Sequence, residues 1–121
     1  MSLRMIPTSV HGAIDYLTGG ALLAAPKVLG LTDEPRAALV LRSAGGGALA
    51  YSLITDYELG LIRLLPVPAH LAMDAASGVL VAASPWLLGF ANRGRRYWLP
   101  HVLVGAMEVL AATSTRTEPA G

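Results

Sequence analysis

Two histidine and aspartate pairs are the residues of this 121-residue chain whose types and spacing could do chemistry. His11 precedes Asp15 by four residues, and His70 precedes Asp74 by the same spacing. Four residues is about one helical turn, so each imidazole and its carboxylate would share one face of a helix. Both pairs lie in apolar segments, where ionisable groups are costly and a function is the default hypothesis. Such groups could bind a metal ion, relay protons or hold helices together.

The two pairs belong to a longer pattern that occurs twice. A His-x3-Asp-x3-Gly-x6-Pro-x3-Gly frame begins at His11 and recurs from His70. When 11–31 is aligned with 70–90, eight positions are identical. We interpret the frame as an internal duplication within a single domain, 1–121. Its parts are repeat one at about 7–58, repeat two at about 66–113 and a polar tail at 114–121.

The composition differs from that of an ordinary soluble domain. Charged residues make up 14% of the chain and apolar residues 54%, with a mean hydropathy of +0.54, whereas a soluble domain has about 25% charged residues. Four apolar stretches of about 20 residues, the length that crosses a bilayer, lie at about 10–31, 36–55, 69–90 and 97–113. They are rich in Ala, Leu and Gly and do not alternate like strands. The sequence therefore predicts an all-α protein of four transmembrane helices; a soluble four-helix bundle is the alternative.

The even number of helices in each repeat predicts how the copies are related. Both copies would enter the membrane from the same side, related by a pseudo-two-fold axis along the membrane normal. Basic residues favour cytoplasmic loops after the first and third helices, because five lie on that side and three on the other. The five are Lys27, Arg36, Arg93, Arg95 and Arg96, and the three are Arg4, Arg63 and Arg116.

Partners and some chemistries are constrained by charge and residue usage. A net charge of +1 with no basic stripe gives no electrostatic attraction to nucleic acid. The chain has no cysteine, which excludes disulfides and thiol chemistry. The expected partners are the lipid bilayer and either a second copy of the chain or another membrane protein.

Each frame forms a narrow stripe on its predicted helix. Positions 11, 15, 19, 22 and 26 fall within an arc of about 80°, and the second copy behaves likewise. We expect both stripes to face the interior of the bundle, because His and Asp are unfavourable against lipid. Glycines at helix interfaces permit close approach; the candidates for this packing role are Gly19, Gly46, Gly78 and Gly105.

Helix rise indicates which polar residues share a depth in the membrane. Antiparallel pairing about a turn near Asp33 sets Asp15 level with about Tyr51. In the second copy, Glu108 lies only about 3 to 5 Å deeper than Asp74. The predicted polar layer contains His11, Asp15, Tyr51, His70, Asp74 and Glu108.

Arg42 and His101 occupy equivalent positions when the offset between His11 and His70 is applied to the second helices. Arg42 would lie roughly 13 to 14 Å from Asp15 along the helix axis, which is too far for a direct ion pair. We therefore predict that Arg42 and His101 form a second layer near the loops, where a long side chain reaches the headgroups.

The segment Ser84-Pro85-Trp86, followed by Leu87-Leu88-Gly89-Phe90, resembles the SPW repeat family of small bacterial membrane proteins. The resemblance covers the whole second copy, including its histidine, aspartate and first glycine. The first copy has Ala25-Pro26-Lys27 in place of the triplet but keeps the rest of the frame. The resemblance implies helical pairs in a bacterial cytoplasmic membrane and supplies no catalytic residue.

Three functions remain open at this stage. The first is a noncatalytic membrane module whose polar layer fixes helix packing or partner binding. The second is a metal site of His11, Asp15, His70 and Asp74 holding Zn, Mn or Fe, or a haem held by the two histidines. The third is proton or ion passage through the layer of Asp15 and Asp74. No nucleophile elbow or phosphate-binding loop is present, which favours a protein that is not an enzyme.

Overall fold

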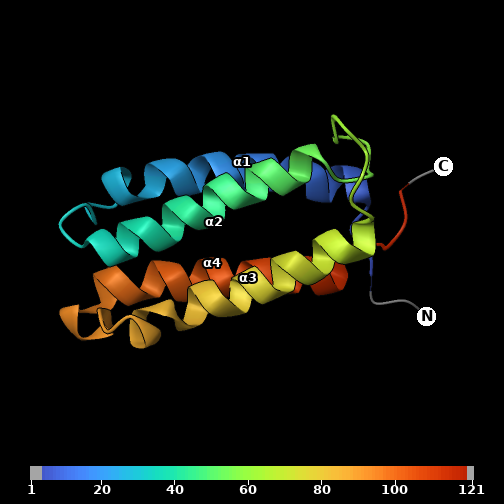
Figure 1. Ribbon diagram of the computed structural model, residues 1–121. Coiled ribbons are helices and arrows are strands. Elements are labelled where there is room, and N and C mark those ends of the chain that lie inside the picture. The colour runs from blue at the N-terminus through green and yellow to red at the C-terminus, as the bar shows by residue number, and fades with distance from the viewer. Residues whose placement is uncertain (1–3, 120–121) are drawn as a thin grey trace.

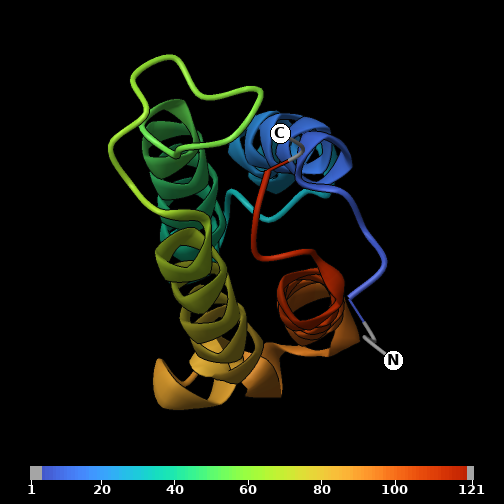
Figure 2. The same ribbon diagram turned by 90° about the vertical axis from the view of Figure 1, so that its right-hand side faces the viewer.

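The computed structural model describes residues 4–119, which form four antiparallel α-helices (Figure 1). The elements are α1 (Thr8–Val28), α2 (Pro35–Leu53), α3 (Val67–Leu87), the short 3₁₀ turn η1 (Ala91–Arg93) and α4 (Arg95–Ser114). No strand occurs within 4–119, and the predicted all-α class is confirmed. Viewed along the bundle, the helices occupy four corners, with α1 beside α2 and α3 beside α4 (Figure 2). The α1–α2 and α3–α4 loops lie at one end, which we call the loop end; the α2–α3 connector lies at the opposite, connector end.

The Pro-x3-Gly half of the sequence frame ends α1 and α3. Gly30 and Gly89 have φ values of 69° and 78°, the left-handed conformation that glycine adopts without a steric penalty. The N–H of the residue after each glycine donates a hydrogen bond to the proline carbonyl: Leu31 donates to Pro26 at 2.7 Å, and Phe90 donates to Pro85 at 2.8 Å. This is the Schellman arrangement, in which an apolar residue follows the glycine and packs back on the helix. The repeated prolines and glycines therefore end both helices in the same way.

Close glycine contacts join the helices within each pair. A Cβ placed on Gly45 would lie 2.7 Å from the carbonyl oxygen of Gly19, and one on Gly78 would lie 2.6 Å from that of Gly105. Gly46, which we expected to form this contact, is half-buried and would meet only Leu23, at 4.0 Å. The α1–α2 contact therefore uses Gly45 in place of Gly46.

The α1–α2 and α3–α4 loops differ in length by one residue, which explains why Gly45 rather than Gly46 forms the contact. Six residues separate α1 from α2, and seven separate α3 from α4. Equivalent residues of α2 and α4, the second helices of the two copies, are therefore one residue further apart in the sequence than equivalent residues of α1 and α3, the first helices. With this larger offset Gly45 matches Gly105, and Leu41 matches His101.

The predicted second layer of Arg42 and His101 is not formed. Arg42 is exposed on α2, whereas His101 is fully buried, as Leu41 is. The ring nitrogens of His101 lie 2.8 Å from the carbonyl oxygen of Tyr97 and 3.4 Å from that of Ala37. The expectation was wrong because the offset that relates the first helices does not apply to the second helices.

Ion pairs join the two loops at the loop end. Arg93 lies 2.9 Å from Glu34 and 3.2 Å from Asp33, and Tyr97 donates to Asp33 at 2.8 Å. Hydrogen bonds from Arg36 and Arg93 lower the pKa of Glu34 to about 2, and the Tyr97 hydroxyl lowers the pKa of Asp33. The loop end is therefore held by ionised carboxylates that connect the two helix pairs.

An apolar core lies beneath these ion pairs, and the outside of the bundle is also apolar. The core consists of Leu22, Leu31, Ala37, Leu41, Phe90 and Tyr97. Large apolar side chains are exposed on every helix, among them Leu17, Leu39, Val79 and Leu103. Among the described residues, α3 is the one helix that is both long and apolar enough to qualify as a membrane span by length and composition.

The glycine contact leads to a prediction about two neighbouring substitutions. Gly45→Ala should lower the free energy of unfolding by about 1–3 kcal/mol, because the added methyl group overpacks the α1–α2 contact. Gly47→Ala should be neutral or stabilising by up to about 1 kcal/mol, because a Cβ there meets nothing within 4 Å and alanine favours the helix. Denaturant unfolding of both variants in detergent measures the difference. Equal effects of the two substitutions would contradict the close packing.

Candidate functional site

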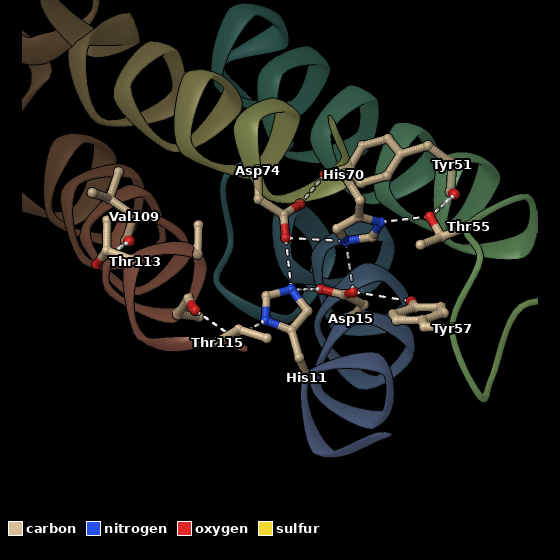
Figure 3. Close-up of polar contacts among 12 residues, drawn as sticks. His11, Asp15, Tyr51, Thr55, Tyr57, His70, Asp74, Val109, Thr113 and Thr115 are labelled. Carbon is tan, nitrogen blue, oxygen red and sulfur yellow. Dashed lines mark hydrogen bonds and ion pairs between the residues drawn. The ribbon is translucent and has the colours of Figure 1, made fainter. Parts of the chain in front are cut away.

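His11, Asp15, His70 and Asp74 converge between the two helix pairs near the connector end (Figure 3). Each offers one ligand-type atom, and these four atoms all lie within 4.8 Å of one another. All four residues are buried, with exposed fractions of 1% for each histidine, 8% for Asp15 and 4% for Asp74. We call this set the His/Asp cluster.

Within the cluster, each histidine contacts both carboxylates through Nε2. His11 Nε2 lies 3.1 Å from Asp15 Oδ1 and 2.7 Å from Asp74 Oδ2. His70 Nε2 lies 2.9 Å from Asp15 Oδ2 and 3.2 Å from Asp74 Oδ2. Two of these contacts stay within one helix and two cross from α1 to α3. The stripes of the two frames therefore face each other.

Two threonines hold the outer nitrogen of each imidazole. His11 Nδ1 lies 2.6 Å from Thr115 Oγ1, and His70 Nδ1 lies 2.7 Å from Thr55 Oγ1. Each hydroxyl donates its own hydrogen to a backbone carbonyl, Thr115 to Ala111 at 2.5 Å and Thr55 to Tyr51 at 2.6 Å. A hydroxyl used in this way accepts from the ring, so both histidines carry a proton on Nδ1.

The inner nitrogens lie between carboxylate oxygens, which can only accept hydrogen bonds when ionised. Each Nε2 therefore also carries a proton, which makes both rings imidazolium ions. Two imidazolium ions and two carboxylates have no net charge. A neutral set is the form in which buried charges are tolerated, because each has an opposite partner.

Two tyrosines complete the surroundings of the carboxylates. Tyr57 donates to Asp15 Oδ2 at 3.1 Å, and Tyr51 donates a short hydrogen bond to Asp74 Oδ1. We expected Tyr51 level with Asp15 in its own repeat, but its hydroxyl contacts the carboxylate of the other repeat. The difference arises because the cluster lies between the helix pairs and α2 packs beside α3.

Short bridges between extended segments position the threonines. Ile6 pairs with Thr115 and Leu65 pairs with Thr55, each as an isolated parallel β-bridge. Ile6 and Leu65 are equivalent positions in the two copies, and each lies shortly before the first helix of its copy. The segment before α1 thus pairs with the segment after α4, and the segment before α3 pairs with the segment after α2.

A family model described as the SPW repeat domain matches residues 9–115, which is nearly the whole chain. The chain belongs to the SPW repeat family. No curated protein and no solved structure shows significant similarity to it.

Glu108 lies beside the cluster of this SPW repeat protein but outside it. It lines a cavity of about 20 Å³ together with His11, Asp15 and Asp74. Glu108 Oε2 is buried and makes no hydrogen bond with the described residues. A cavity of this size can hold one water. Of the predicted polar layer, the structure brings the two histidines, the two aspartates and Tyr51 into direct contact and leaves Glu108 adjacent.

Three residues that contact the cluster were not predicted as members of the polar layer: Thr55, Tyr57 and Thr115. All three lie just beyond the end of a helix, where helical periodicity gives no orientation. A signal existed for the threonines, because Thr55 and Thr115 are related by the same offset as Gly45 and Gly105, the offset that applies to the second helices.

The dimensions of the cluster limit its chemistry. A haem between His11 and His70 does not fit, because the adjoining cavity of about 20 Å³ is far smaller than the several hundred Å³ of a cofactor pocket. Proton passage across the bundle would have to cross the apolar core of Leu22, Leu31, Leu41 and Phe90 at the loop end. The arrangement suits paired charges or a single small cation.

The buried ion pairs predict different effects of two carboxyl-to-amide substitutions in this SPW repeat protein. Asp74→Asn should lower the free energy of unfolding by about 3–5 kcal/mol, because it leaves the imidazolium ions with one carboxylate. Glu108→Gln, made one helix away, should change it by less than about 1 kcal/mol, because no ion pair is lost. Unfolding in detergent followed by circular dichroism measures both. A loss for Glu108→Gln as large as that for Asp74→Asn would contradict the assignment of the charges.

Proposed function

We propose that this protein is a noncatalytic integral membrane module of four transmembrane helices, in which the His/Asp cluster joins two helix-pair repeats. The observation that carries the proposal is that His11 contacts Asp74 and His70 contacts Asp15 across the pairs. Fixing the pairs in this way would give the module one defined outer surface for lipid, a second copy or another membrane protein.

The outer surface of the helices supports a place in the membrane. The four helices have 19 to 21 residues, which corresponds to about 28–32 Å at 1.5 Å per residue and matches a hydrocarbon core of about 30 Å. Arg42 is the one exposed charged side chain between the first and last turns of these helices. A long arginine side chain can reach the headgroups from such a position.

Matched contacts support a duplicated origin and a pseudo-two-fold axis along the membrane normal. Each histidine contacts the aspartate of the other copy, and each receives its threonine from the other copy. The two β-bridges also join one copy to the other, and an equivalent glycine contact occurs once within each copy. Contacts that exchange between two copies are what a two-fold axis between them produces.

The basic residues support the orientation. The loops and helix ends at the loop end contain five basic residues, Lys27, Arg36, Arg93, Arg95 and Arg96. The segments next to the helix ends at the connector end contain three, Arg4, Arg63 and Arg116. The excess favours a cytoplasmic loop end in a bacterial membrane.

The topology can be tested with single cysteines, because the chain has none of its own. Thr32→Cys and Asn92→Cys should react with a membrane-impermeant maleimide from the cytoplasmic side, and Leu61→Cys from the other side. Leu103→Cys, on a helix exterior, should react only after detergent is added. Labelling of Leu61 and Asn92 from the same side, or recovery of the protein without membranes, would overturn four spans. A full inversion would keep the spans and reverse the orientation.

The role of the cluster can be tested with spin labels on the outside of the helices. A label pair at Leu17 and Val79, on α1 and α3, reports the distance between the helix pairs. In His11→Gln/His70→Gln this distribution should broaden, because the cross-pair contacts are lost. A pair at Leu17 and Leu39, within one helix pair, should keep its width. If both distributions stay narrow in the double variant, the cluster does not join the repeats.

A further inference from the structure

We infer that the His/Asp cluster is also a binding site for one divalent transition-metal ion. The ligands are His11 Nε2, His70 Nε2 and one carboxylate oxygen each from Asp15 and Asp74. The inference goes beyond the proposed structural role, since ion pairs alone could join the helix pairs.

The nitrogen–oxygen distances in the cluster are slightly shorter than the ligand–ligand distances of a tetrahedral metal centre. Ligands at about 2.0–2.2 Å from zinc lie about 3.3–3.6 Å from one another. The four contacts between Nε2 atoms and carboxylate oxygens span 2.7 to 3.2 Å, and those of Asp15 use both of its oxygens. All four ligand atoms lie within 4.8 Å of one another. An ion at the centre therefore requires the short nitrogen–oxygen contacts to lengthen by a few tenths of an ångström and the widest pair of ligand atoms to move closer together.

The outer partners are those that metal ligands require. A ligating histidine usually donates its second ring N–H to an oxygen, and a ligating carboxylate is itself hydrogen-bonded. His11 and His70 have Thr115 and Thr55 at Nδ1 (Figure 3). Tyr57 and Tyr51 donate to the two aspartates. All four candidate ligands are thus oriented by an oxygen from outside the cluster.

One inner nitrogen is left without a well-formed hydrogen bond. His70 Nε2 is buried and has no hydrogen-bond partner of acceptable geometry among the described residues, although Asp15 and Asp74 oxygens lie at 2.9 and 3.2 Å. Its N–H direction is therefore aligned with neither carboxylate. On metal binding this nitrogen would lose the proton that neither aspartate accepts in good geometry, and its electron pair would bind the ion.

Charge balance selects a divalent ion. Without metal the cluster holds two carboxylates and two imidazolium ions. Binding of one M²⁺ releases two Nε2 protons to solvent and leaves two neutral imidazoles, two carboxylates and the ion. The net charge is zero before and after, so no uncompensated charge is buried.

The donor set narrows the ion further. Imidazole with carboxylate suits Zn²⁺, Mn²⁺ and Fe²⁺, whereas Mg²⁺ and Ca²⁺ prefer oxygen ligands alone. A four-coordinate set of two nitrogens and two oxygens fits Zn²⁺ best, with Co²⁺ as its spectroscopic substitute.

The test uses the full chain, purified in detergent and stripped with chelator. Co²⁺ titration should give visible ligand-field bands that saturate at one ion per chain and disappear when Zn²⁺ is added. In weakly buffered solution, binding should release two protons per ion. X-ray absorption of the Zn²⁺-loaded protein should report two imidazoles among four light-atom ligands. This measurement needs no variant that could fail to fold.

Two threonine variants provide a matched comparison. Thr115→Val removes the oxygen that orients His11 and should weaken Co²⁺ binding about 10–100-fold. Thr113 is exposed and bonds only to nearby carbonyls of its own helix, so Thr113→Val should bind as the unchanged chain does. Folded protein that gives no saturable band, or equal affinities in the two variants, would overturn the metal site. Neither result would contradict the joining of the repeats, which the spin-label distances measure separately.

Discussion

The exchange of charged partners between the two helix pairs is the constraint on which this structure depends. An imidazolium or carboxylate buried alone in an apolar bundle costs several kcal/mol. His11 and Asp15 could satisfy each other at 3.1 Å within α1, but the shorter contact of His11 is to Asp74 on α3, at 2.7 Å. The neutral arrangement with two partners for each charge exists only when both pairs are in place. The charges therefore determine how the pairs meet as well as how each helix is stabilised.

Different interactions act within the pairs and between them. Within a pair, Gly19 meets Gly45 and Gly78 meets Gly105, so backbone packing determines the helix spacing. Between the pairs, ion pairs act at both ends: they are buried at the connector end and partly exposed at the loop end, where a small apolar core lies beside them. In a bilayer, the burial of apolar surface contributes little to the free energy of helix association, because lipid tails are equally apolar. Close packing and polar contacts between the helices therefore have to stabilise the bundle. This division agrees with a protein whose outer surface is apolar along most of its length.

The sequence predicted the elements with strong periodicity and missed those without it. The two stripes followed from helical geometry because every frame residue from the histidine to the proline lies on a regular helix, and the buried residues of α1 and α3 include them all. Tyr57 and Thr115 follow helix ends, where side-chain direction depends on the tertiary path of the chain. The expected equivalence of Arg42 and His101 was wrong because the α3–α4 loop is one residue longer than the α1–α2 loop. With one additional residue, a position on α4 faces about 100° away from the position on α2 to which the shorter offset assigns it, which is more than a quarter of a turn. A single alignment offset could not describe both helices of a repeat.

The placement of Thr115 has a consequence for how the chain assembles. His11 lies on α1, and the hydroxyl that orients its ring is separated from it by 104 residues. Until α4 has been made and its end has returned beside Ile6, the imidazole lacks its outer partner, and until α3 has formed it lacks Asp74. While only the first helix pair has formed, His11 lacks Asp74 and Asp15 lacks His70. The contact between His11 and Thr115 can therefore form only when all four helices are in place, and a chain cut before Thr115 would leave the Nδ1 atom of His11 without this partner.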